Sequence, residues 1–224
     1  MTTPDSSTPP LFHSSSLPLI AWAVAARPLA GQSVSGDLYV VAPFPAGVLV
    51  GVIDGLGHGE EAAAAAAIAV TTLTAHAHEP IILLVKRCHE QLKGTRGVVM
   101  SVASFTVRDN SMTWVGMGNV EGLLRRVDVN SQPPYASLLL RGGVLGYQFP
   151  PLRAFVLPVA RGDLLIFATN GIRNDFARDS SPSDPLRRHT QDGPQHLANR
   201  VLAQYGKSTD DALVLVVRYL GGAP

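Results

Sequence analysis

Cysteine is nearly absent from this chain of 224 residues, since Cys88 is its single cysteine. One cysteine cannot form an internal disulfide, which excludes a small secreted scaffold held by disulfides and favours a reducing compartment. Cys88 lies within a helical pattern. We therefore interpret it as a buried thiol rather than a nucleophile.

The chain also lacks an excess of charge of one sign, because it contains 18 Lys and Arg and 17 Asp and Glu, for a formal net charge of +1. Basic residues occur as isolated pairs such as Arg125-Arg126, so neither nucleic acid nor an anionic membrane is expected as a partner. No apolar run reaches the ~20 residues needed to cross a bilayer. The apolar segment 17–26 follows no Lys or Arg, so it does not fit a signal peptide. We expect a cytoplasmic protein.

The composition that remains is that of one folded domain. With 46% hydrophobic and 16% charged residues, the chain can bury a sizeable core. Residues 1–16 are rich in Ser, Thr and Pro, which predicts a flexible N-terminal tail. The domain itself is expected over residues 17–224.

The most informative stretch is residues 48–61, where an apolar strand pattern ends in Asp54 and is followed by glycines and an Ala-rich helical pattern. The glycines at 55, 57 and 59 allow backbone angles that side chains forbid, so Asp54 can be presented beside a carbonyl and several amides. The spacing fits neither a P-loop nor a dinucleotide-binding turn. Two interpretations stay open here: an ordinary strand-to-helix turn, or a site for a cation or an oxyanion.

A second acid, Asp37, begins the strand pattern of residues 35–41. A turn at 43–46 connects that strand to the one that ends in Asp54. In an antiparallel hairpin the start of one strand lies beside the end of the other, so both carboxylates are expected at the same end of the sheet. This favours a site over a simple turn.

The rest of the chain contains many more strand patterns than helical ones. Helices are predicted over residues 60–78, from Pro80 to before Gly94, and over 195–205. Strands are predicted over residues 18–26, 98–107, 112–117, 120–127, 137–140, 152–157, 163–169 and 212–219, with Asp109-Asn110 and Gly118-Asn119 as hairpin turns. This order argues for an α+β fold in which two stacked antiparallel sheets are covered by helices.

Oxygen donors recur at the ends of these strands, namely Asp37, Asp54 with the Gly55 carbonyl, Asn170, and Asp210-Asp211. Hard oxygen ligands without His or Cys are the set that Mg²⁺ or Mn²⁺ prefers. His76, His78 and His89 have no acidic or cysteine partner at ligand spacing, so we do not expect them to bind metal.

These motifs, in their order and spacing, resemble those of the PPM metal-dependent serine/threonine phosphatases, and most closely the bacterial SpoIIE-type branch in its compact, RsbX-like stressosome form. The resemblance covers about residues 18–219 and is carried by Gly36-Asp37, by Asp54-Gly55-Leu56-Gly57-His58-Gly59, by Thr169-Asn170-Gly171 and by Asp210-Asp211.

The resemblance implies an αββα sandwich with a dinuclear Mn²⁺ or Mg²⁺ centre. Asp54 would bridge both metals, Gly55 would offer its carbonyl to the first, Asp210 would bind the second, and Asp37 would hold metal-bound water. Such a centre lets hydroxide attack phosphorus without a covalent intermediate. Asn170 stands where the family usually has a second-metal aspartate, so the second site is expected to be weaker.

Three other side chains have open interpretations. His58 would contact a metal-bound water or the phosphate, or it would only shape the turn. Asp211 would support the ligands from behind or be a turn residue, rather than bind metal itself. Asp175 is a candidate compensating ligand for Asn170, and Asp163 is interpreted as a turn acid. The phosphate-holding arginine of eukaryotic relatives has no counterpart just before Asp37, and Arg27 is too far upstream to be assigned.

The implied substrate is a phosphorylated STAS-domain protein of a stress-signalling complex, dephosphorylated at Ser or Thr. The polar segment 178–194 is the expected docking loop. Asn170 keeps an alternative open, in which the domain binds a phosphoprotein with little turnover.

Overall fold

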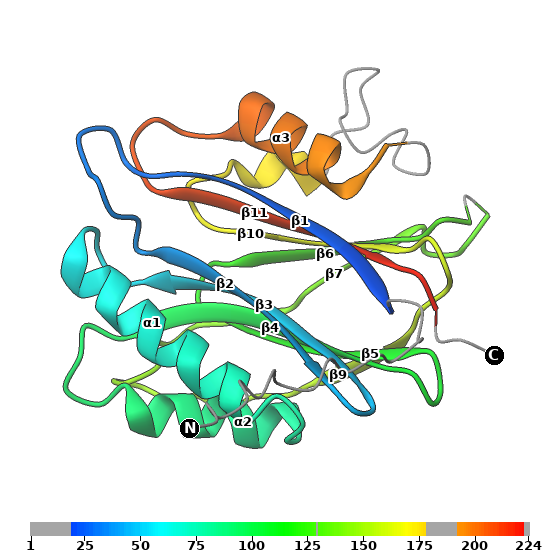
Figure 1. Ribbon diagram of the computed structural model, residues 1–224, viewed down its shortest axis with the longest axis horizontal. Coiled ribbons are helices and arrows are strands. Elements are labelled where there is room, and N and C mark those ends of the chain that lie inside the picture. The colour runs from blue at the N-terminus through cyan, green and yellow to red at the C-terminus, as the bar shows by residue number, and fades with distance from the viewer. Residues whose placement is uncertain (1–18, 129, 178–191, 222–224) are drawn as a thin grey trace, which may run out of the picture.

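The structure is a computed structural model that describes residues 19–128, 130–177 and 192–221. The expected tail at 1–16 lies outside these ranges, as does most of the predicted docking segment 178–194. Within the described residues, two stacked sheets are flanked by helices on both outer faces (Figure 1). The predicted α+β sandwich with an αββα order of layers is therefore confirmed.

The first sheet has the strand order β1-β11-β10-β6-β7. Its strands are β1 (Ile20–Arg27), β6 (Glu121–Arg125), β7 (Tyr135–Ser137), β10 (Leu164–Ala168) and β11 (Ala212–Tyr219). The second sheet has the order β2-β3-β4-β5-β8, and β9 also pairs with β5. Its strands are β2 (Asp37–Phe44), β3 (Gly47–Gly55), β4 (Val98–Thr106), β5 (Ser111–Met117), β8 (Leu140–Arg141) and β9 (Phe155–Pro158).

Two helices, α1 (Glu60–Ala75) and α2 (Ile81–Gln91), cover the second sheet, and α3 (Pro194–Tyr205) covers the first (Figure 1). A short 3-10 turn, Asn174–Ala177, lies beside α3. The buried face of α1 consists largely of alanines, such as Ala62, Ala65 and Ala69. Small side chains let the helix approach the sheet closely. Cys88 is buried in α2, as its pattern predicted.

Strand β3 shows how the sequence pattern becomes three packed layers. Leu49 and Ile53 belong to the core between this sheet and α1 and α2, whereas Val48, Val50 and Val52 belong to the core between the two sheets. Alternate residues of a strand point to opposite faces, so a strand covered on both faces is apolar throughout. Continuing the alternation by two residues from Val52 directs Asp54 toward the space between the sheets.

Two sequence predictions about strand pairing were wrong. Gly118-Asn119 does not close a hairpin, because β5 and β6 belong to different sheets. The strand predicted at 137–140 is divided between β7 and β8, which also lie in different sheets. A turn-forming dipeptide signals a change of chain direction but does not determine which sheet the next strand joins. The hairpin at Asp109-Asn110 is confirmed, with Asn110 at a φ of 48°.

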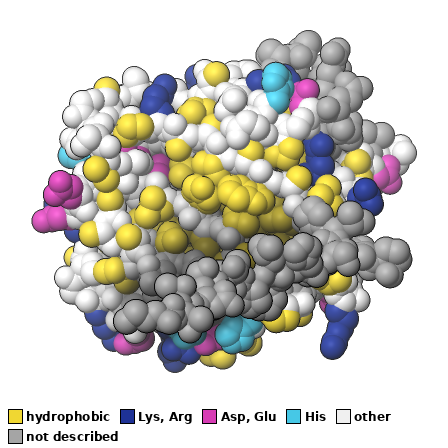
Figure 2. Space-filling model, in the orientation of Figure 1, with side chains coloured by type: hydrophobic (Ala, Val, Ile, Leu, Met, Phe, Trp, Pro, Cys, Tyr) yellow, Lys and Arg dark blue, Asp and Glu magenta, His cyan; other side chains and the backbone are white. Residues whose placement is uncertain are grey.

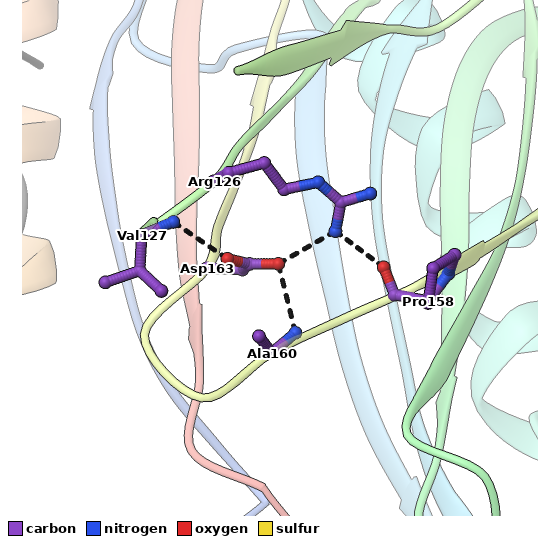
Figure 3. A network of polar contacts seen from close by, with 5 residues as sticks. All are labelled: Arg126, Val127, Pro158, Ala160 and Asp163. Atoms are coloured by element: carbon purple, nitrogen blue, oxygen red, sulfur yellow. Dashed lines mark hydrogen bonds and ion pairs between the residues drawn. The ribbon is translucent and has the colours of Figure 1, made fainter. Parts of the chain in front are cut away.

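Asp163 precedes β10 at the end opposite to Asn170, and it is 1% exposed. Figure 3 shows its carboxylate accepting hydrogen bonds from Arg126 Nη1 (2.9 Å), Val127 N (2.8 Å) and Ala160 N (3.0 Å). Its role is therefore structural, in agreement with its interpretation as a turn acid. A buried carboxylate with several donors holds the β6, β9 and β10 connections together.

One edge strand of each sheet, β1 and β2, lies on the face of the molecule where hydrophobic side chains gather (Figure 1 and Figure 2). Trp22 of β1 and Tyr39 of β2 are 43% and 39% exposed, and their ring centroids are 5.7 Å apart. This aromatic contact joins the two edge strands across the sandwich. Among the described residues, none of the helices is long and apolar enough to cross a membrane.

Candidate functional site

Four strand ends meet at one end of the sandwich. Asp37 opens β2 and Asp54 lies one residue before the end of β3, and the two are directly paired in the antiparallel register. Asn170 follows β10 and Asp210 precedes β11, and these two strands are neighbours in the other sheet. The juxtaposition of Asp37 and Asp54, which the hairpin argument predicted, is confirmed.

Thr169 connects the two sheets at this end. Its hydroxyl donates to Asp37 Oδ2 at 2.7 Å, and it accepts a hydrogen bond from Leu213 N at 3.0 Å. Leu165 and Phe167 of β10 point into the core between the sheets, and the alternation places Thr169 on the same face. Sequence reasoning did not assign Thr169 a role, although this alternation was the available signal.

Asp211 binds backbone N–H groups and does not line the cavity described below. Its two carboxylate oxygens accept hydrogen bonds from Leu29 N (2.7 Å) and Gly36 N (2.8 Å), and its side chain is buried. It thereby ties the β1–β2 connection to the start of β11. These contacts agree with the prediction that Asp211 is not itself a metal ligand.

The glycines of the elbow after β3 have different roles. Gly57 and Gly59 adopt positive φ values of 92° and 78°, which side chains disfavour. Gly55 is instead required by close packing, because a Cβ there would lie 2.1 Å from the carbonyl oxygen of Ala62 in α1. His58 lies exposed between these two glycines of positive φ.

A cavity of about 320 Å³ lies in front of this elbow. Its polar lining residues are Asp54, His58, Asn119, Asn170, Thr209 and Asp210. Most of the sequence-predicted site therefore converges on one cavity. Asp37 does not line this cavity. Its side chain is 4% exposed and lies behind the cavity, where it accepts a hydrogen bond from the Thr169 hydroxyl. The exposure of His58 leaves both of its interpretations open.

The acids of this cluster raise one another's pKa. Burial, together with repulsion from the nearby carboxylates of Asp54, Asp211 and Asp210, raises the pKa of Asp37 from 3.8 to about 8, against the opposing effect of the Thr169 hydrogen bond. Burial also raises the pKa of Asp54 to about 7, with added repulsion from Asp210 and Asp211. Concentrated negative charge in a partly buried site is the environment that a divalent cation would neutralise.

The donor set fits a hard divalent cation, since it consists of carboxylate, amide and carbonyl oxygens. Within residues 19–128, 130–177 and 192–221, however, no group of three or more His, Cys, Asp or Glu side chains is arranged so that it could hold a metal ion. Asp54 and Asp210 line the cavity, whereas Asp37 and Asp211 do not and direct their carboxylates to Thr169 and to the backbone of Leu29 and Gly36. A cation there would also need the Gly55 carbonyl and water.

A second cavity, of about 420 Å³, adjoins the first, because Asn119 and Asn170 line both. Its other lining residues are Glu121, Ile172, Arg173, Asn174, Asp175 and Lys207. Asp175 pairs with Arg173 at 3.4 Å and does not line the first cavity, so its placement does not favour the interpretation as a compensating ligand. Arg27 donates to the Lys207 carbonyl and thus holds the chain beside this cavity.

The sequence model for stage II sporulation protein E (SpoIIE) matches residues 45–220. The phosphoserine phosphatase RsbX of Bacillus subtilis is 24% identical over 142 residues, which are 63% of this chain and 69% of RsbX. A structure from work on the bacterial stressosome and secondary messenger signalling has a TM-score of 0.79 at 26% identity, over 89% of this chain and 99% of that one. RsbX in complex with magnesium has a TM-score of 0.74 at 20% identity, over 92% and 97% of the two chains. Because the family match spans well over half of the chain, the protein is an RsbX-like member of the SpoIIE family of PPM-type phosphatases.

Proposed function

We propose that this protein hydrolyses phosphoserine or phosphothreonine on a partner protein, with Mn²⁺ or Mg²⁺ bound at the end of the sandwich. The observation that carries the proposal is the convergence of Asp54, Asp210 and Asn170 from three strand ends on one cavity, with Asp37 paired behind Asp54. The similarity to RsbX, a phosphoserine phosphatase, supports the same reaction class.

In this proposal Asp54, Asp210 and the Gly55 carbonyl hold the cation, and Asn170 offers a neutral oxygen donor. The bound cation would lower the pKa of a water molecule and neutralise charge on the phosphate. Asp37 and Thr169 fix the carboxylate arrangement from behind. His58 stands at the mouth of the cavity, where it can meet the phosphate or a water.

We propose a phosphorylated STAS-domain protein of a stress-signalling complex as the substrate, as the motif resemblance implies. The similarity to a phosphoserine phosphatase and to a structure from work on the bacterial stressosome supports a phosphoprotein of such a complex. The elbow and its cavity face the outside, so a phosphorylated loop of a folded partner can reach the acids.

The test is Mn²⁺-dependent hydrolysis of p-nitrophenyl phosphate and of a phosphoserine STAS-domain protein. We expect turnover that EDTA abolishes and that Asp54→Ala reduces to the uncatalysed background. Asp109→Ala is the matched control, because Asp109 is an exposed acid on the β4–β5 hairpin at the far end of the sheet. Equal activity of the Asp54→Ala and Asp109→Ala variants would refute the proposal.

A second candidate function is phosphoprotein binding with little turnover, and Asn170 is the observation that favours it. An amide carries no charge, so it holds a cation more weakly than a carboxylate does. If only the Asn170→Asp variant turns over while the native chain still binds the phosphorylated partner, the binding role is the correct one.

A further inference from the structure

Lys207 lines the second cavity and is held in place by three hydrogen bonds. Its backbone N–H donates to the Gly171 carbonyl at 2.7 Å, and its own carbonyl accepts a hydrogen bond from Arg27 Nη2 at 2.5 Å. Its ammonium donates to the main-chain carbonyl of Asn170 at 2.7 Å. A lysine with a fixed backbone and one anchored donor loses less conformational freedom when it binds a ligand.

The ammonium group retains donor capacity at this position. A lysine has three N–H donors, and the Asn170 carbonyl accepts one of them. Asn170 is also one of the two residues that line both cavities, so the charge of Lys207 lies at their border. An anion bound near Asp54 and Asp210 would need such a positive group beside it.

Arg173 is the other basic residue among the described residues that line the two cavities, and its guanidinium already has other partners. Arg173 has its guanidinium carbon 5.4 Å from the Tyr205 ring centroid, donates to the Gln204 carbonyl at 3.2 Å and pairs with Asp175 at 3.4 Å. The described lining of the first cavity contains neither Lys nor Arg. Arg27 is directed to the Lys207 carbonyl.

We propose that Lys207 binds the phosphoryl group of the substrate, at the border between the acid-lined cavity and its neighbour. This inference rests on the proposed function and adds the residue that holds the substrate's charge. Lysine serves as a compact point charge for phosphate rather than as a two-pronged clamp. The neighbouring cavity of about 420 Å³ then accommodates the peptide that carries the phosphate.

The experiment measures binding of inorganic phosphate to the Mn²⁺-loaded full chain by calorimetry, which requires no turnover. The main variant is Lys207→Gln, because its amide can still donate to the Asn170 carbonyl while the charge is lost. Lys207→Arg tests rescue by charge. Lys93→Gln is the matched control, since Lys93 is an exposed lysine beyond α2 that pairs with Glu90.

We expect Lys207→Gln to weaken phosphate binding about tenfold, as for loss of one hydrogen bond to a charged group. Lys207→Arg should restore most of that loss, and Lys93→Gln should change nothing. The KM for p-nitrophenyl phosphate and for a phosphoserine peptide should rise by a similar factor. Mn²⁺ affinity should stay unchanged, which separates a role in anion binding from one in shaping the metal site.

Two results would overturn the proposal. One is unchanged phosphate affinity in a Lys207→Gln variant that still binds Mn²⁺. The other is a KM that rises only for the phosphopeptide, which would mean that Lys207 contacts an acidic side chain of the peptide. If no variant hydrolyses any substrate but phosphate binding still depends on Lys207, the proposed enzymatic function fails while this inference stands.

Discussion

The cluster of buried acids predicts that the metal-free protein loses stability as the pH rises from 5 to 7. The pKa of Asp37 is raised to about 8 and that of Asp54 to about 7, from an ordinary value of 3.8. Between pH 3.8 and these raised values, the carboxyl groups are still protonated in the folded state but have already released their protons in the unfolded state. Their stabilising contribution is therefore complete below pH 3.8 and is lost as the pH rises through the folded-state values.

The magnitude follows from proton linkage. Each pH unit changes the free energy of unfolding by about 1.4 kcal/mol for every carboxyl that stays protonated only in the folded state. From pH 5 to 7 the loss is about 3 kcal/mol if one carboxyl behaves in this way and about twice that if both do. For a chain of this length, the smaller figure lowers the melting temperature by roughly 6 to 12 °C.

The assay is a series of thermal melts in excess EDTA from pH 5 to 8, followed by circular dichroism. Asp37→Asn is the comparison variant, because it removes one buried charge and leaves an acceptor for the Thr169 hydroxyl. Its melting temperature should fall less steeply with pH than that of the native chain. Excess Mn²⁺ should also flatten the native curve, because the cation stabilises the ionised acids. A native melting temperature in EDTA that is constant or rises from pH 5 to 7 would refute the reasoning.

Three further predictions concern residues around the site and away from it. Asp211→Asn should lower the free energy of unfolding by about 1–3 kcal/mol in urea melts, because a buried backbone N–H loses its acceptor. Gly55→Ala should leave little soluble folded protein, since its Cβ would lie 2.1 Å from the Ala62 carbonyl oxygen; near-native yield would contradict this packing. Asp163→Ala should destabilise the fold by about 3–5 kcal/mol by leaving Arg126 partly buried without its carboxylate, yet leave the KM of the remaining folded enzyme unchanged.

The hairpin argument predicted more of the site than any single motif did. Asp37 and Asp54 were placed side by side from the order of two strands and a short turn, and the register pairs them directly. This succeeded because antiparallel pairing over a short connection leaves little freedom. The αββα layers followed from the motif resemblance, and the apolar run of β3 fits a strand covered on both faces.

The sequence predictions failed where the residues in contact are far apart in the sequence. The sequence analysis assigned no role to Lys207 or Thr169, because their contacts are with residues 37 and 132 positions away. The transfer of the chain from β5 to the other sheet at Gly118 was missed for a related reason. Local turn chemistry fixes the backbone angle at Gly118, with a φ of 89°, but the packing of whole sheets decides where the next strand goes.

Asn170 gives the last prediction, because it reduces the negative charge of the cluster. It lines the cavity together with Asp54 and Asp210, so Asn170→Asp adds a third carboxylate there. Two carboxylates about 8 Å apart repel by about 2 kcal/mol at an effective dielectric constant near 20, before the charges and solvent adjust, and each new pair in this cavity is expected to repel on that scale. The metal-free Asn170→Asp protein should therefore melt at a lower temperature than the native chain above pH 7, while it binds Mn²⁺ more tightly. Melts in EDTA and a Mn²⁺ titration measure both effects on the same two proteins. If both quantities stay unchanged, residue 170 does not act on the acid cluster, and the charge of this site must be balanced in another way.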